Sequence, residues 1–224
     1  MRKMKLFFNA LTKFICGILL AGLLVFLPAG SLKYSNGWLF LIVMFIPIFI
    51  MGIVLFIKSP KLLKKRLDTK EKEKTQKGIV ACSGILFLLG FILSGLDFRF
   101  GWSFVPKAVT VTAVFTFISG YILYAEVMRE NAYLSRIIEV EENQKVIDSG
   151  LYGIIRHPMY AATILMFLSV PLILGSWWAV ICFGVYPVLI CMRLKNEEEI
   201  LTEQLEGYVE YKQKVKYRLI PFIW

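Results

Sequence analysis

The sequence predicts an all-α polytopic membrane protein with four transmembrane helices, a C-terminal helical hairpin and cytoplasmic amphipathic helices. Hydrophobic residues make up 58% of the 224 residues, charged residues make up only 19%, and the mean hydropathy is +0.67. This composition is too apolar for an ordinary soluble domain. The apolar residues form long blocks instead of alternating with polar ones, which favours membrane helices over a β-barrel.

Four apolar blocks are predicted to form single transmembrane helices, since about 20 residues cross a bilayer. They cover residues 14–28, 38–57, 79–96 and 105–127. A fifth stretch, 159–191, is too long for one crossing and is interrupted by Pro171 and by Gly175-Ser176. We therefore expect two helices that form a hairpin.

The distribution of basic residues predicts the orientation in the membrane. Four Lys and Arg precede residue 14, nine lie in residues 58–77, and six follow from Arg193 onward. By the positive-inside rule, both termini and the 58–77 loop are expected in the cytoplasm. Residues 128–156 and 193–224 then share this face. We expect an integral, multi-pass protein of a prokaryotic plasma membrane, with its active site on the cytoplasmic side.

The net charge of +10 does not indicate a nucleic-acid-binding protein. Nucleic-acid-binding faces usually interleave aromatic with basic residues, and residues 58–77 contain no aromatic residue. Basic clusters beside membrane helices set topology and attract anionic head groups, so membrane lipids are the expected partners. The four cysteines lie in apolar blocks without metal-ligand spacing, and we expect neither a metal nor a disulfide.

The only histidine, His157, lies in a polar and aromatic segment directly before the predicted hairpin. A residue before a proline is biased out of the α region, and Pro158 suits a first helical turn. The N–H groups at such a helix start can bind a carboxylate or a phosphate. Arg156 adds a charge, while Tyr152 and Tyr160 add hydroxyl groups. The same residues are also typical of interfacial anchors and an aromatic belt, and local chemistry leaves both interpretations open.

A second polar segment follows the hairpin directly and returns to the same face. On a helix, Arg193, Glu197 and Leu201 line up at four-residue spacing. A surface salt bridge worth about 0.3–0.5 kcal/mol is the simplest interpretation. Three consecutive acidic residues directly after a membrane helix, where basic anchors are usual, weaken that interpretation. An apolar stripe that includes Leu205 and Tyr208 predicts an amphipathic tail against the membrane domain.

Together, the two segments resemble the isoprenylcysteine carboxyl methyltransferase family and its phospholipid methyltransferase relatives. The resemblance rests on Gly-x-Tyr-x-x-x-Arg-His-Pro-x-Tyr at 150–160 and Arg-x-x-x-Glu-Glu-x-x-Leu at 193–201, with the hairpin between them. A Tyr-x-x-Tyr tail that ends in Leu-x-Pro completes it, so that it covers about residues 131–224. The chain departs from the family in Ala162, where a glycine is frequent, and in a shorter segment before Tyr208.

The resemblance implies methyl transfer from S-adenosylmethionine at the membrane surface. It divides the chain into N-terminal transmembrane helices, residues 1–128, and a cofactor-binding and catalytic region, residues 129–224. Arg193 is implied to bind the substrate's carboxylate, and Arg193 and Arg156 are the expected catalytic residues. The implied cofactor contacts fall on Gln144, Lys145, Val146, Ile147, Tyr152, His157, Pro158, Met159, Tyr160, Glu197 and Glu198.

The expected acceptor is a lipid-like or amphipathic molecule that enters from the bilayer. Arg193 favours a carboxylate, as in O-methylation of an isoprenylcysteine, but an arginine also binds phosphate, which leaves a phospholipid amine or a small thiol open. A nicotinamide-dependent membrane reductase of the sterol-reductase type is a second hypothesis, although the chain has no glycine-rich dinucleotide fingerprint. A transporter is a third, and it would require ionisable residues inside the apolar blocks, which carry essentially none except Glu126 near one end.

Overall fold

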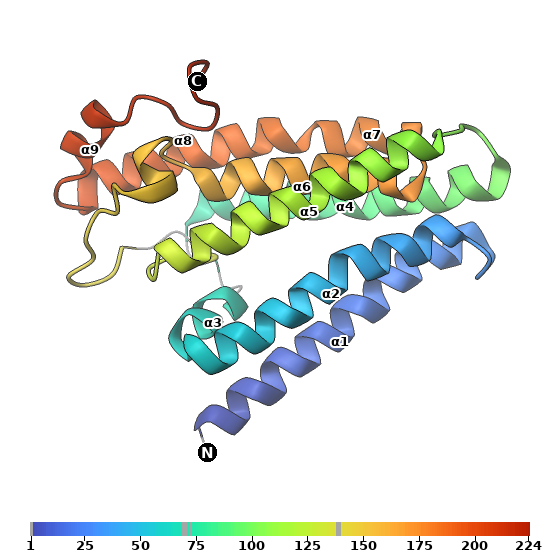
Figure 1. Ribbon diagram of the computed structural model, residues 1–224, viewed down its shortest axis with the longest axis horizontal. Helices are drawn as coiled ribbons and strands as arrows, with labels where there is room; N and C mark the ends of the chain where they lie inside the picture. Colours follow the sequence, from blue (N-terminus) through green and yellow to red (C-terminus); the bar gives the residue numbers. More distant parts are fainter. Residues whose placement is uncertain (1, 69–70, 72, 138–139) are drawn as a thin grey trace.

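The computed structural model describes every residue except 1, 69–70, 72 and 138–139, and helices dominate it (Figure 1). No strand occurs among the described residues, so the predicted all-α class is confirmed. The N-terminal elements are α1 (Arg2–Ala29), α2 (Ser35–Lys58), α3 (Pro60–Leu67), α4 (Lys74–Phe100) and α5 (Lys107–Glu130). The C-terminal elements are the 3-10 helix η1 (Gly150–Gly153), α6 (Pro158–Leu174), α7 (Trp177–Gly184), α8 (Tyr186–Gln204) and α9 (Tyr208–Lys214).

The predicted apolar blocks correspond to the long helices. In the described part of the chain, five helices are long and apolar enough to cross a membrane, with α7 and α8 counted as one continuous helix, Trp177–Gln204. The remaining apolar helix, α6, has 17 residues and is shorter than the others. These lengths are those of an integral membrane protein.

The stretch predicted as a hairpin turns at Gly175, which ends α6 in the left-handed region at φ 79°. Ser176 then caps α7, because its side chain accepts a hydrogen bond from the Ala179 N–H. Pro171 was also expected to interrupt the stretch, but it lies inside α6. It removes one backbone hydrogen bond, to the carbonyl four residues earlier, and α6 ends soon after it at Leu174.

Small residues allow the helices to approach closely. A Cβ atom on Gly95 of α4 would lie 2.6 Å from the carbonyl oxygen of Val25 in α1. A Cβ atom on Gly120 of α5 would lie 2.9 Å from Met166 in α6. Such contacts replace the hydrophobic driving force that helices lack inside a bilayer. The α5–α6 pair, the most extensive in the molecule, therefore forms a firm support for the residues that precede α6.

One end of the bundle is fixed by a buried carboxylate. Helix α4 continues past the predicted end at residue 96, so that Asp97 lies inside it at 1% exposure. Its Oδ2 accepts hydrogen bonds of 2.6 Å from the Ser103 and Ser176 hydroxyls. Asp97 thus joins the α4–α5 connection to the hairpin turn, and its hydrogen bonds offset the cost of burying a charge.

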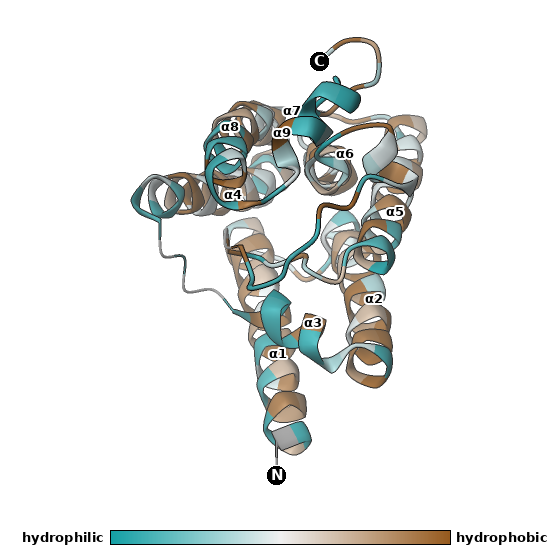
Figure 2. Cartoon of the chain, turned by 90° about the vertical axis from the view of Figure 1, so that its left-hand side faces the viewer, coloured by the Kyte–Doolittle hydropathy of each residue, from teal (hydrophilic) through white to brown (hydrophobic). Residues whose placement is uncertain are grey.

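The other end of the bundle gathers the polar parts of the chain. Both termini, α3, α9 and the irregular connection between α5 and α6 lie there (Figure 1). Figure 2 shows that α3, α9 and the adjoining helix ends are the hydrophilic part of the molecule. This end is therefore where polar residues from distant parts of the sequence meet.

Candidate functional site

A cavity opens at the polar end, between the α5–α6 connection, α8 and the C-terminal tail. Its empty volume is about 870 Å³, which includes the open solvent at its mouth. All the site residues predicted from the sequence line this cavity except Pro158 and Glu198. Those that line it are Gln144, Lys145, Val146, Ile147, Tyr152, Arg156, His157, Met159, Tyr160, Arg193 and Glu197.

His157 is fixed at the start of α6 by the C-terminal tail. It forms the N-cap with φ −127° and ψ 59°, outside the α region, as expected for a residue before a proline. The N–H groups of Arg156 and His157 donate to the carbonyl oxygens of Tyr217 and Arg218, both at 2.9 Å. The segment that enters α6 therefore runs beside the tail, and these two N–H groups are already paired.

Glu198 joins α8 to both of these segments from outside the cavity. It is 3% exposed, and its Oε1 lies 2.7 Å from Arg156 Nε and 3.1 Å from His157 Nε2. Its Oε2 accepts a hydrogen bond of 3.0 Å from Arg218 Nε. Three basic groups thus surround one buried carboxylate, which suits charge-assisted hydrogen bonding. The arrangement makes Glu198, predicted as a cofactor contact, a residue that holds the walls of the cavity together.

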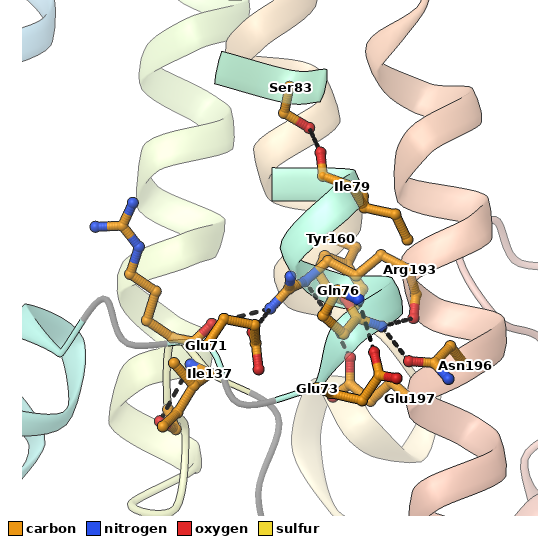
Figure 3. A network of polar contacts seen from close by, with 12 residues as sticks. Glu71, Glu73, Gln76, Ile79, Ser83, Ile137, Tyr160, Arg193, Asn196 and Glu197 are labelled. Carbon is orange, nitrogen blue, oxygen red and sulfur yellow. Dashed lines mark hydrogen bonds and ion pairs between the residues drawn. The ribbon is translucent and has the colours of Figure 1, made fainter. Parts of the chain in front are cut away.

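Glu197, the neighbouring residue, belongs to a different network that faces the cavity (Figure 3). The Tyr160 hydroxyl donates to Glu197 Oε2 at 2.5 Å and accepts from Arg193 Nε at 3.0 Å. Arg193 is 8% exposed, and its Nη2 donates to the Arg136 carbonyl oxygen at 2.9 Å and lies 3.4 Å from Glu71. Tyr160 therefore separates an anionic group from a cationic one at the cavity wall.

Two contributors to this network lie far from the predicted site in the sequence. Glu71 precedes α4, and Gln76, which is 0% exposed, lies in its first turn. Gln76 Nε2 donates to the Arg193 carbonyl oxygen at 3.2 Å and to Asn196 Oδ1 at 2.5 Å. Neither residue belongs to a sequence motif, and the basic residues around them predict only membrane topology.

Tyrosine hydroxyls and an irregular segment complete the wall. The Tyr152 hydroxyl accepts a hydrogen bond of 3.0 Å from Asn131 Nδ2, and the Tyr211 hydroxyl donates to the Tyr152 carbonyl oxygen at 2.8 Å. Tyr208 also lines the cavity, and its hydroxyl is buried and has no hydrogen-bond partner in the part of the chain that the structure describes. Buried polar groups are normally paired, so the unpaired Tyr208 hydroxyl is a candidate contact for a bound molecule.

Burial raises the pKa of Tyr152, Tyr208 and Tyr211 well above the ordinary tyrosine value. Desolvation is the main cause, because it penalises the charged phenolate. For Tyr208 the charges of Glu198 and Glu197 act in the same direction. All three hydroxyls are therefore protonated near neutral pH, and they can donate hydrogen bonds but do not act as bases.

The Gln144–Ile147 segment lines the cavity together with residues of the C-terminal tail. Val146 packs on a cluster of Leu205, Tyr208 and Tyr211 from the end of α8 and from α9. The cavity thus combines an apolar side with Glu197, Arg193 and several hydroxyl groups. Such a site can bind a molecule that carries both an amino group and an acid group.

Residues 108–207 match the family model described as phospholipid methyltransferase. The match covers α5, the α5–α6 connection, the hairpin and α8, and so includes most of the cavity wall. None of the curated proteins compared with the chain matches it. The family match confirms the resemblance that the sequence motifs indicated.

Proposed function

We propose that this chain is a membrane methyltransferase that uses S-adenosylmethionine to methylate a lipid-like acceptor. Its residues 108–207 match the phospholipid methyltransferase family. The single observation that carries the proposal is the cavity at the polar end of apolar helices, because the residues expected to contact the cofactor surround it. A cofactor can enter such a cavity from water while an amphipathic acceptor enters from the bilayer. We place the cavity, and with it both termini, on the cytoplasmic side.

The polar groups of the cavity fit the chemistry of this cofactor. Glu197 offers a carboxylate for its amino group, and the aromatic rings suit its sulfonium. The unpaired Tyr208 hydroxyl can donate to a ribose hydroxyl or to the cofactor's carboxylate. The apolar surface around Val146 and Leu205 suits a flat base.

When bound, S-adenosylmethionine supplies an activated methyl group that an acceptor atom takes up by in-line displacement. The protein's task is then to align the acceptor and to exclude water. Arg193 is proposed to hold the acid group of the acceptor. Tyr160 fixes Arg193 and Glu197 relative to each other, since it is hydrogen-bonded to both.

The acceptor is proposed to be a carboxylate, as in an isoprenylcysteine. A carboxylate nucleophile needs no general base, whereas an amine has to lose a proton, and the buried tyrosines of the cavity stay protonated. A phospholipid amine is the second candidate, favoured by the description of the matching family. The methyltransferase family leaves a nicotinamide-dependent reductase without support.

The test is methyl transfer by the purified protein. It is incubated with methyl-labelled S-adenosylmethionine and membrane extract, and the labelled lipids are treated with base. Label released as methanol indicates a methyl ester, whereas base-stable label indicates an amine or a thioether. The proposal is wrong if the protein transfers no label and binds no S-adenosylmethionine in equilibrium dialysis.

A further inference from the structure

Three arginines from separate parts of the chain converge beside the cavity. Arg193 comes from α8 and donates to the carbonyl oxygen of Arg136, in the α5–α6 connection, at 2.9 Å. Arg66 comes from α3, and its Nη1 donates to the carbonyl oxygen of the adjacent Ser135 at 2.9 Å. Arg136 and Arg193 line the cavity, and so do Ser135 and Met159, which Arg66 contacts.

Arg66 is surrounded by neutral groups. Besides Ser135, it contacts the Tyr124 hydroxyl, lies over the Tyr124 ring at 5.4 Å and approaches Met159 Sδ at 3.7 Å. Within the described residues, no carboxylate forms an ion pair with Arg66 or with the side chain of Arg136. A part-buried charge without a counterion costs stability, so its presence indicates a function that needs it.

The electrostatic surroundings of Arg136 also favour a bound anion. Its side chain remains accessible to solvent. Desolvation by the surrounding protein and the nearby charges of Arg66 and Arg193 nevertheless lower the pKa of Arg136. Among the described residues that line the cavity, Glu197 is the only acid, and it is already hydrogen-bonded to Tyr160. Glu71 is paired with Arg193 at 3.4 Å, but no carboxylate of the described residues is paired with the side chains of Arg66 and Arg136, and a bound anion would supply that negative charge.

We infer that Arg66 and Arg136 extend Arg193 into a subsite for the acidic head group of the methyl acceptor, whether a phosphate or a carboxylate. The inference rests on the proposed function. Guanidinium groups match the planar and tetrahedral oxyanions of these acids and bind them in bidentate fashion. The subsite assigns a part of the reaction to α3, an element outside the segment that matches the family. Glu197 is left for the cofactor's amino group.

The test measures binding, so that it does not depend on finding the physiological acceptor. The full-length protein in a neutral detergent is unfolded thermally with matched amphiphiles. One pair is dihexanoyl phosphatidic acid and neutral dihexanoylglycerol; the other is N-acetyl-S-farnesylcysteine and its methyl ester. Inorganic phosphate alone is a fifth sample. We expect at least one acid to raise Tm by several degrees more than its neutral counterpart, and the better acid identifies phosphate or carboxylate.

Arg66→Gln and Arg136→Gln should each weaken binding of the preferred acid at least tenfold, while the Kd for S-adenosylmethionine changes less than twofold. Lys64→Gln is the matched control, because it removes a charge from the exposed side of the same helix and should change neither affinity. Arg66→Lys should recover part of the binding, which separates lost charge from misfolding.

Equal Tm shifts for the acid and neutral members of both pairs would overturn the inference. So would unchanged acid binding in both glutamine variants, or a parallel loss of cofactor affinity, which would assign the arginines to the cofactor. A shift with inorganic phosphate as large as that with phosphatidic acid would assign them to a free anion. Wild-type protein that binds the acid but no S-adenosylmethionine would instead contradict the proposed function.

Discussion

Glu198 and Arg218 form an ion pair, with 3.0 Å between Glu198 Oε2 and Arg218 Nε, that fastens the C-terminal tail to helix α8. The Glu198 side chain is 4% exposed and the Arg218 side chain 31%. The same carboxylate contacts Arg156 and His157 at the start of α6. One buried charge therefore holds together three segments that surround the cavity, and its removal should affect folding before it affects chemistry.

We predict that Glu198→Gln lowers the free energy of unfolding by about 3 kcal/mol, because it leaves the buried Arg156 guanidinium without its counterion. Thermal unfolding in detergent measures the effect as a lower Tm. Glu199→Gln is the control, since Glu199 is exposed and one residue away, and it should leave Tm unchanged. Equal Tm values for the two variants would contradict the role given to Glu198.

Two tyrosines of the tail should respond differently to loss of the hydroxyl. Tyr208→Phe removes a buried hydroxyl that has no partner in the described chain, so we expect no loss of stability. We expect its affinity for S-adenosylmethionine to fall about fivefold to tenfold, the size of one hydrogen bond of about 1 kcal/mol.

Tyr211→Phe is the counterpart, because its hydroxyl donates to the Tyr152 carbonyl oxygen at 2.8 Å. This variant should lose about 1 kcal/mol of stability. Equilibrium dialysis and thermal unfolding of both variants separate the two effects. A Tyr208→Phe protein with wild-type cofactor affinity would show that this hydroxyl does not contact the cofactor.

The helices and the main site motifs could be predicted because both depend on local sequence. Long apolar blocks specify membrane helices, and the hairpin brings residues around 157 and 193 to one face. The division of labour between Glu197 and Glu198 could not be predicted in the same way. Adjacent helical residues point about 100° apart, so Glu197 and Glu198 need not face the same surroundings, and only packing decides which of them faces the cavity.

The contributions of Arg66, Glu71 and Gln76 to the site could not be predicted from the sequence either. They reach the site from a segment more than 100 residues before Arg193, through contacts that depend on how α3 and α4 pack. The positive-inside rule already explains the charge of Arg66, which hides any further role. The acidic Glu71 and the neutral Gln76 belong to no motif of the sequence. Tertiary contacts of this kind leave no periodic pattern for a sequence to display.

Glu197 and Arg193 should separate cofactor binding from acceptor use. We predict that Glu197→Gln raises the Kd for S-adenosylmethionine about tenfold, equivalent to about 1.4 kcal/mol, because it removes the charge proposed to pair with the cofactor's amino group. Arg193→Gln should instead raise the KM for the acceptor and change the cofactor Kd little. Glu203→Gln, an exposed acid of the same helix, is the control for both measurements. Parallel changes of Kd and KM in both variants would contradict this division.

The turn before α6 provides a test of how strictly the cavity wall is shaped. Gly150 has φ 57°, in the left-handed region, and a Cβ atom there would collide with the Glu130 carboxylate. That carboxylate accepts a hydrogen bond of 2.9 Å from the Leu151 N–H, so Glu130 cannot move without losing it. We predict that Gly150→Ala costs about 1–3 kcal/mol of stability. Because Tyr152 follows two residues later in η1, cofactor affinity should fall as well.

Gly78→Ala is the matched control, since nothing lies within 4 Å of a Cβ atom at that position in α4. An alanine in a helix interior is favoured over glycine by about 0.5–1 kcal/mol, so this variant should be slightly more stable than the wild type. Thermal unfolding gives the stability of both variants, and equilibrium dialysis with S-adenosylmethionine gives their affinity. If Gly150→Ala keeps wild-type stability and affinity, the turn tolerates a side chain and Glu130 does not fix the position of Tyr152.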